Sequence, residues 1–425
     1  MPQTKIGSGF VSSGAISVSN LSATGTPSSS TFLRGDGAWA SPGLVWQAVQ
    51  TTNFTAVSGR GYPVNTTSGA ITVTFPSSPS IGDSIVIIDY ASTFATNNCT
   101  INPSGANLQG ATTNAILNTL GLAINFVYVD STRGWLPYAS TSGRLARPYS
   151  ISWLLAAGGG GGGGANSQPG GSGGGAGGLG LASSVTFVPG TVITVTVGAG
   201  GSAVNANNAT SGSNSVISFG AVTETAYGGG YGCVDASTAS TGGSSGGGTP
   251  RTAPSASATR GAGTYSTFYG NVGGSAAAPN NNGAGGGGGA GGAGVATTTV
   301  NGANGGVGLQ SSITGSAVYY SGGGGGGGGY NGGSGSTGGL GGGGNGASQT
   351  GVGGAATANT GGGGGGAGGS AQGGWQQIGG NGGSGVVILS LPTVSYSGVT
   401  TGSPTVTTSG SNTILRFTAS GTYTA

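Results

Sequence analysis

Side chains that could act as acids, bases or nucleophiles are scarce in this sequence. It has no histidine, six acidic residues and nine basic residues among 425 positions. A serine–histidine pair and an imidazole metal ligand are therefore excluded. Asp83, Asp89 and Asp130 fall in one region, but nothing places two carboxylates at the spacing of a glycosidase pair. We expect a protein that is not an enzyme and that needs no metal or other cofactor.

Aromatic side chains indicate a different kind of chemistry, the recognition of another molecule. Within residues 158–385, most aromatic side chains lie in loops between runs of glycine, where a rigid support would give them a large contact area at low entropic cost. The alternative is that they cap the edges of the domain, and the sequence leaves both open. Trp375, closely followed by Ile378, is expected to be a packing residue. The candidate contact residues are Arg251, Arg260, Tyr265, Phe268, Tyr269, Tyr319, Tyr320 and Tyr330. The leading ones lie in the longest loop that is poor in glycine, residues 249–282.

A glycine-rich block, residues 158–385, must position these side chains. The chain has 105 glycines, most of them in this block. Uninterrupted runs occupy residues 158–164, 285–289, 322–329 and 361–366. Helix and sheet both disfavour glycine, but an extended helix with three residues per turn remains open to it. We predict a bundle of such polyglycine II helices, whose backbones pair laterally and approach closely because glycine has no Cβ.

Apolar strands are predicted to frame this block. Residues 151–155 lead into Gly158, and residues 386–391 follow Gly385. We expect these first and last strands to pair and to hold the ends of the rods in register. Two hairpins are predicted between them, 185–188 with 191–197 about Pro189-Gly190, and 216–219 with 221–227 about Gly220.

The region before the block is predicted to form a small sandwich or barrel. Its β-branched or aromatic runs are residues 46–49, 71–75, 84–90, 100–102, 123–130 and 135–138. The expected fold class is mainly β with a polyglycine II bundle and almost no α-helix. The expected divisions are an attachment or shaft segment (1–43), a β domain (44–141), a linker (142–150), the glycine-rich domain (151–391) and a last β element (392–425).

Charge and cysteine content exclude several classes of partner. The net charge is +3 and the basic residues do not cluster, which argues against nucleic acid as a partner. No apolar run approaches the length of a membrane span, and the polar start is not a signal peptide. Cys99 and Cys233 lie in different regions, so no disulfide framework is inferred. Low charge with abundant Ser, Thr, Asn and Gly suggests exposure to an outside medium.

Three stretches resemble segments of bacteriophage tail proteins. Residues 21–39 resemble a segment that recurs in tail fibres; the tripeptide Arg34-Gly35-Asp36 within it also matches an integrin-binding motif, although we favour a simple turn. Residues 128–135 look like the ending of small knob modules in phage fibres. The strand into polyglycine, residues 194–201 and residues 385–388 together closely resemble the glycine-rich domain of phage tail proteins and the tip adhesins of T-even-type phages.

This resemblance implies a virion protein, a tail fibre or adhesin, that attaches the particle to a host bacterium through loops on a glycine-rich tip. The implied partners are a receptor on the host surface, either a polysaccharide or an outer-membrane protein, and other tail proteins bound through the N-terminal region. The chain is expected to form a homotrimer. The alternative is a structural or ice-binding glycine-rich protein, since ordered polyglycine slabs can expose flat, regular faces.

Overall fold

The computed structural model describes residues 32–33, 39–40, 44–138, 147–166, 169–204, 209–234, 237–250, 257–276, 283–370 and 376–425. The chain divides into two compact units, Met1–Arg147 and Pro148–Ala425. Within these ranges nearly all regular structure is β-strand, and the helical element is the short 3₁₀ turn η2 (Thr393–Ser395), so the predicted mainly-β class is confirmed. No helix of the described residues is long and apolar enough to cross a membrane. The Arg34–Asp36 tripeptide, Arg251 and Trp375 lie outside the described residues.

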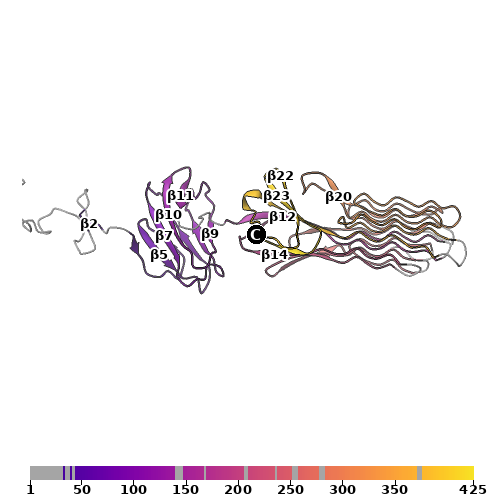
Figure 1. The fold of residues 1–425 in the computed structure, drawn as a ribbon, viewed down its shortest axis with the longest axis horizontal. Coiled ribbons are helices and arrows are strands. Elements are labelled where there is room, and N and C mark those ends of the chain that lie inside the picture. Colours follow the sequence, from indigo (N-terminus) through magenta and orange to yellow (C-terminus); the bar gives the residue numbers. More distant parts are fainter. Residues whose placement is uncertain are drawn as a thin grey trace, which may run out of the picture. The chain divides into compact units, whose positions relative to one another are not determined.

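Two sheets form the first unit, one ordered β11–β10–β7–β5–β3 and the other β4–β6–β8–β9 (Figure 1). The strands are β3 (Val45–Trp46), β4 (Phe54–Thr55), β5 (Arg60–Val64), β6 (Ile71–Thr74), β7 (Ser84–Asp89), β8 (Cys99–Asn102), β9 (Ala115–Leu117), β10 (Ala123–Asp130) and β11 (Gly134–Pro137). Strands β3 to β8 alternate between the sheets and pair in parallel within each, so the chain winds as a flattened coil. Antiparallel strands β9, β10 and β11 complete the two sheets. A separate antiparallel pair joins β1 (Phe32–Leu33) to β2 (Trp39–Ala40).

The core of the first unit lies between its two sheets. Val73 and Ile101 of one sheet and Ile85 and Ile87 of the other are fully buried in a single apolar cluster. At one end of the cluster, the ring of Phe75 meets Phe126 at 5.1 Å and Trp135 at 5.0 Å, both edge to face. The sequence left a small sandwich or a barrel open for this region, and the structure has two facing sheets. The coiled path was not predicted, because short strands do not reveal which strand pairs with which.

The second unit also has two large sheets, ordered β18–β13–β12–β21–β23–β22 and β17–β16–β15–β14–β24. Their strands are β12 (Tyr149–Ala156), β13 (Leu179–Phe187), β14 (Val192–Thr196), β15 (Ser215–Phe219), β16 (Val222–Ala226), β17 (Gly261–Ala262), β18 (Thr267–Tyr269), β21 (Val386–Pro392), β22 (Thr405–Ser409), β23 (Asn412–Phe417) and β24 (Gly421–Thr424). The predicted pairing of first and last strands is confirmed, since β12 runs antiparallel to β21 with Leu154 opposite Ile388. Residues beyond 392, expected as a last β element, supply β22, β23 and β24 to the same two sheets.

One of the two predicted hairpins is wrong. Strands β13 and β14, which flank Pro189-Gly190, belong to different sheets, so the turn is an arch between layers. The N–H of Gly190 donates to the carbonyl of Ala425 rather than across a hairpin (2.6 Å). The second hairpin is confirmed, because β15 and β16 pair directly about Gly220, whose φ of 54° is readily adopted only by glycine.

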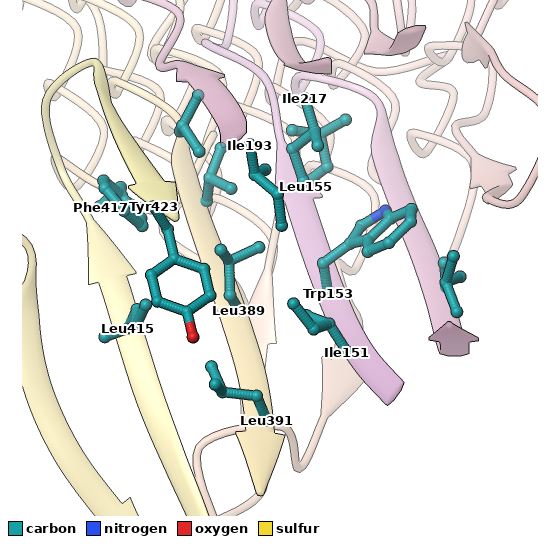
Figure 2. Close-up of a cluster of buried hydrophobic side chains, with 14 of the residues drawn as sticks. Ile151, Trp153, Leu155, Ile193, Ile217, Leu389, Leu391, Leu415, Phe417 and Tyr423 are labelled. Atoms are coloured by element: carbon teal, nitrogen blue, oxygen red, sulfur yellow. The ribbon is translucent and has the colours of Figure 1, made fainter. Parts of the chain in front are cut away.

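An apolar core fills the space between the two sheets (Figure 2). Alternate residues of β12, Ile151, Trp153 and Leu155, enter this core, while Leu154 and Ala156 face the opposite side. The other contributors labelled in Figure 2 are Ile193, Ile217, Leu389, Leu391, Leu415, Phe417 and Tyr423. The opposite side is covered by β19 (Leu309–Ser311) and β20 (Val318–Tyr320), where Tyr320 packs in a second cluster. The six-stranded sheet is therefore the middle layer of the frame.

Extended rods fill the rest of the unit and are drawn as wavy traces in Figure 1. In rod 158–164, Gly158 and Gly161 donate N–H groups to segment 209–214, Gly159 and Gly162 to segment 377–385, and Gly160 and Gly163 to segment 170–178. The partner changes at every residue and returns after three, as in a helix with three residues per turn. The carbonyls of the same rod accept from three further segments, 228–234, 198–202 and 361–370. The rod thus has six neighbours, and the predicted polyglycine bundle is confirmed.

The close approach of the rods explains their composition. A Cβ added at Gly159 would lie 2.0 Å from the carbonyl oxygen of Gly362, and one at Gly324 would lie 2.0 Å from that of Gly364. Non-bonded heavy atoms need roughly 3.5 Å. A side chain at these positions would push two rods apart and break the hydrogen bonds between them.

Candidate binding surfaces of the glycine-rich unit

The rods end in turns at two opposite ends of the bundle, one next to the sheets and one away from them (Figure 1). We call the second the outer end and define it by the described turns 298–301, 330–332 and 349–351. Hydrogen bonds hold these turns side by side, because Gly329 donates to Val300 at 2.7 Å and Gln349 donates to Gly333 at 3.0 Å. The side chain of Gln349 also accepts from the N–H of Gly332 (3.2 Å). These three described turns are therefore fixed to one another by hydrogen bonds.

The chemical character of the outer turns is neutral and polar. Thr298, Thr299, Asn301, Asn331 and Thr350 are exposed. Tyr330, one of the candidate contact residues, is half-buried at the point where rod 322–329 ends. The three described turns can offer hydroxyl and amide hydrogen bonds and an aromatic ring, and none of their own residues is charged.

Four candidate residues gather at the opposite end, around β18. Phe268 and Tyr269 lie in this edge strand, pair with Gly180 and Leu179 of β13, and are half-buried. The Phe268 ring covers the glycine backbone of β13, because a Cβ on Gly180 would lie 2.7 Å from it. Arg260 has an exposed side chain whose Nε donates to the carbonyl of Gly270 (3.0 Å). The stretch 249–282 is therefore not one loop, since it contains β17, β18 and parts of several rods.

Tyr265 is the most exposed of the three aromatic candidates at this end, with 47% of its surface accessible. Its ring stacks on Phe219 (centroids 6.1 Å apart, 26° between planes) and meets Trp153 edge to face (6.3 Å). The indole Nε1 of Trp153 donates to the hydroxyl of Ser266 in the same turn (3.0 Å). Tyr265 is thus fixed on the buried aromatic core, with about half of its surface open to contact.

A buried carboxylate fixes the turn that carries Tyr265. The oxygens of Glu224 accept three backbone N–H groups, from Thr264 (2.6 Å), Tyr265 (2.8 Å) and Ser266 (2.9 Å). Burial alone would raise the pKa of Glu224, but the hydrogen bond from the Ser266 side chain and those from the three N–H groups outweigh it, and the pKa lies below its usual value. Gly263 is required here, since a Cβ would lie 2.2 Å from Oε2 of Glu224. Sequence reasoning did not predict this role for Glu224. The available signal was an acidic residue between two threonines in a short strand, a position where the side chain can point into the domain.

The two remaining candidates lie next to each other on β20 and point in different directions. Tyr319 is 36% exposed, whereas Tyr320 is 4% exposed and belongs to the cluster under the six-stranded sheet. Burial raises the pKa of Tyr320, partly offset by Arg416 and by a hydrogen bond with Thr314. Of this pair only Tyr319 is open to a partner. The candidates that the structure describes therefore occupy three separate places rather than one site.

Asparagine side chains complete the hydrogen bonding of the rod that contains Ser334 and Thr337, a role that sequence reasoning missed. Oδ1 of Asn301 accepts from the N–H of Ser334 (2.9 Å), and Oδ1 of Asn304 accepts from that of Thr337 (3.1 Å). Both the acceptors and the donors are three residues apart, as the helix period requires. Side-chain amides thus take the place of carbonyls from a further rod.

Clusters that could hold a metal ion are absent from the described residues, where no three His, Cys, Asp or Glu side chains come together. The two cysteines are both buried and unbridged, and Cys233 donates from Sγ to the carbonyl of Gly247 (3.2 Å). The surfaces described above therefore present hydrogen-bonding and aromatic groups rather than reactive ones.

Comparison with known proteins supports the interpretation of the second unit. The family model of the glycine-rich domain matches residues 140–392, which contain the first and last paired strands and all of the rods. A search of the curated proteins finds no match to the chain. The matched region is more than half of the sequence, and the chain belongs to the glycine-rich domain family.

Proposed function

We propose that this protein is an adhesin of a bacteriophage tail, which attaches the particle to a bacterial surface without catalysis. The observation that carries the proposal is the rod lattice, in which main-chain groups supply the hydrogen bonds between rods. Turn side chains that take no part in these bonds, unlike those of Asn301 and Gln349, can change in sequence without disturbing the lattice. A rigid scaffold with variable connections is a common basis for recognition.

We propose the outer turns as the contact surface. The polypeptide enters this unit at Tyr149, at the start of β12 and next to the sheets, so the outer end lies farthest from the point of entry. The turns 298–301, 330–332 and 349–351 combine exposed hydroxyls and amides with the ring of Tyr330. This is the chemistry that suits an uncharged sugar or a loop of an outer-membrane protein.

The remaining parts of the proposal follow from the resemblance of the sequence to bacteriophage tail proteins. The first unit and the segment before it would join the chain to other tail proteins, and the protein would act as part of the virion. Tyr265 and Tyr319 are the second-choice contacts, since both are partly exposed but stand at the sheet end of the rods.

The test is binding of the fluorescently labelled full-length protein to cells of a strain that the parent particle infects. We expect saturable binding that blocks adsorption of the particle. Cells stripped of surface polysaccharide separate the two receptor classes, because binding lost with the polysaccharide identifies a sugar and binding that survives identifies a protein. Absence of binding to susceptible cells would refute the adhesin and leave a structural role.

A further inference from the structure

The two sheets of the first unit carry different residues on their outward faces. Strands β6 and β8 alternate apolar and polar residues, with Thr72 and Thr74 outward from β6 and Thr100 and Asn102 outward from β8. Strand β7 does not alternate, and reads Ile85-Val86-Ile87-Ile88. Ile85 and Ile87 fill the core, so Val86 and Ile88 face outward.

The same apolar character extends across the whole five-stranded sheet. Its register places Trp46, Gly61, Val86 and Asn125 in one outward row, Pro63, Ile88 and Ala123 in a second, and Ser84, Val127 and Leu136 in a third. Trp46 is 49% exposed and its ring lies on Gly61, where a Cβ would come within 2.6 Å of the indole. No residue of the three rows is charged. We call this surface the Trp46 face.

The choice between threonine and valine makes this difference informative. The two side chains have nearly the same shape and both suit strands, so a sheet can expose either without a change in packing geometry. The outward positions of β6, β8 and β16 are mostly threonine, including Thr223 and Thr225 in the second unit. The outward positions of β7 are valine and isoleucine. A continuous apolar run is typical of a parallel strand that is buried on both faces, and β7 is buried on only one within this chain.

We propose that a second copy of this chain covers the Trp46 face, with sheet packed against sheet. The three rows of this face are mostly apolar and hold no charged residue, so the partner must be apolar and uncharged as well. Among the outward sheet faces in the described ranges, the four-stranded sheet and the five-stranded sheet of the second unit present mainly Thr, Ser and Asn. The complement that this chain offers is therefore the Trp46 face itself. The inference stands without the proposed function, because it uses only the residues on the outward faces of the sheets.

The experiment measures the mass of the full-length protein by light scattering over a range of concentrations. The test variant is Val86→Thr with Ile88→Thr, which gives β7 the alternation of β6 and keeps its β-branched shape. We expect the native chain to be oligomeric and the variant to associate about tenfold more weakly or worse, since buried hydroxyls without partners oppose association. The matched control, Thr72→Val with Thr100→Val on the opposite sheet, should keep the native mass.

Folding is checked by the thermal unfolding of each variant. If the double variant melts early, Val127→Thr on β10 repeats the test from a neighbouring strand. A native chain that is monomeric at every concentration overturns the proposal. So does an oligomer whose mass is the same in the folded test variants, because its interface would then lie elsewhere.

Discussion

Replacing Gly324 by alanine tests how the rods hold together. Gly324 lies in rod 322–329, and its new Cβ would be 2.0 Å from the carbonyl oxygen of Gly364 in the neighbouring rod 361–370. Relief of that overlap needs a separation of roughly 1.5 Å, given a normal contact of about 3.5 Å. The two rods are joined by hydrogen bonds from Gly363 to Gly322 (2.9 Å), from Gly366 to Gly325 (2.9 Å) and from Gly369 to Gly328 (2.8 Å).

The magnitude follows from these three bonds. Each lost hydrogen bond costs about 1 kcal/mol, and more where the groups stay buried without partners. Alanine also lowers the conformational entropy of the unfolded chain, and this effect offsets about 0.4–1 kcal/mol of the lost stability. We therefore expect Gly324→Ala to lower the free energy of unfolding of the second unit by about 2–4 kcal/mol.

Calorimetric and urea unfolding measure this loss, and Gly292→Ala is the control. A Cβ on Gly292 would meet the Cγ1 atom of Val307 at 3.1 Å, a side-chain methyl that can move aside, and the Val307 nitrogen at 3.8 Å, an ordinary contact. We expect the control to change stability by less than about 1 kcal/mol. Equal stability of the Gly324 variant and the native chain would refute the account of the lattice, because the rods could then separate without loss.

Three further predictions concern single buried groups. The pKa of Glu224 is lowered in the folded state, so its contribution is present at neutral pH and is lost as the pH falls through that value; Glu224→Gln should cost about 2 kcal/mol at pH 7 and flatten the acid side of the stability profile measured by calorimetry. Ser321 adopts a left-handed φ of 56° and buries a hydroxyl without a partner, so Ser321→Gly should raise the melting temperature, with a net gain of about 1 kcal/mol. Burial and the nearby Asp89 raise the pKa of the Cys99 thiol to about 12, so iodoacetamide at pH 8 should label Cys99 only after unfolding, as mass spectrometry of native and urea-treated protein would reveal.

The sequence was sufficient to predict the rods because glycine leaves few choices. A run such as 322–329 has no side chain to bury, so its stability must come from main-chain hydrogen bonds to neighbouring rods. Apolar runs at both ends of the block predicted strands there, and β12 and β21 pair as expected. What could not be predicted is which rod lies beside which, since every glycine N–H is the same donor.

Errors arose where distant residues decide the local structure. Pro189-Gly190 suits a hairpin and an arch equally well, and the deciding partner, Ala425, lies at the other end of the unit's sequence. Residues 249–282 looked like one exposed loop, but β18 within them pairs with β13. Phe268 and Tyr269 therefore belong to the edge of the six-stranded sheet. Aromatic residues were therefore easy to find from the sequence, while their distribution over three places was not.

The most direct test of the proposed contact surface compares three tyrosines on the folded full-length protein. Tyr330→Ala changes the outer end, whereas Tyr265→Ala and Tyr319→Ala change exposed rings at the sheet end. The measured quantity is the concentration of each variant that blocks adsorption of the parent particle to susceptible cells. We predict that Tyr330→Ala needs about tenfold more protein than the native chain, the loss expected for one aromatic anchor, and that the other two match the native chain. Loss confined to Tyr265→Ala or Tyr319→Ala would contradict the account and place the contact next to the sheets.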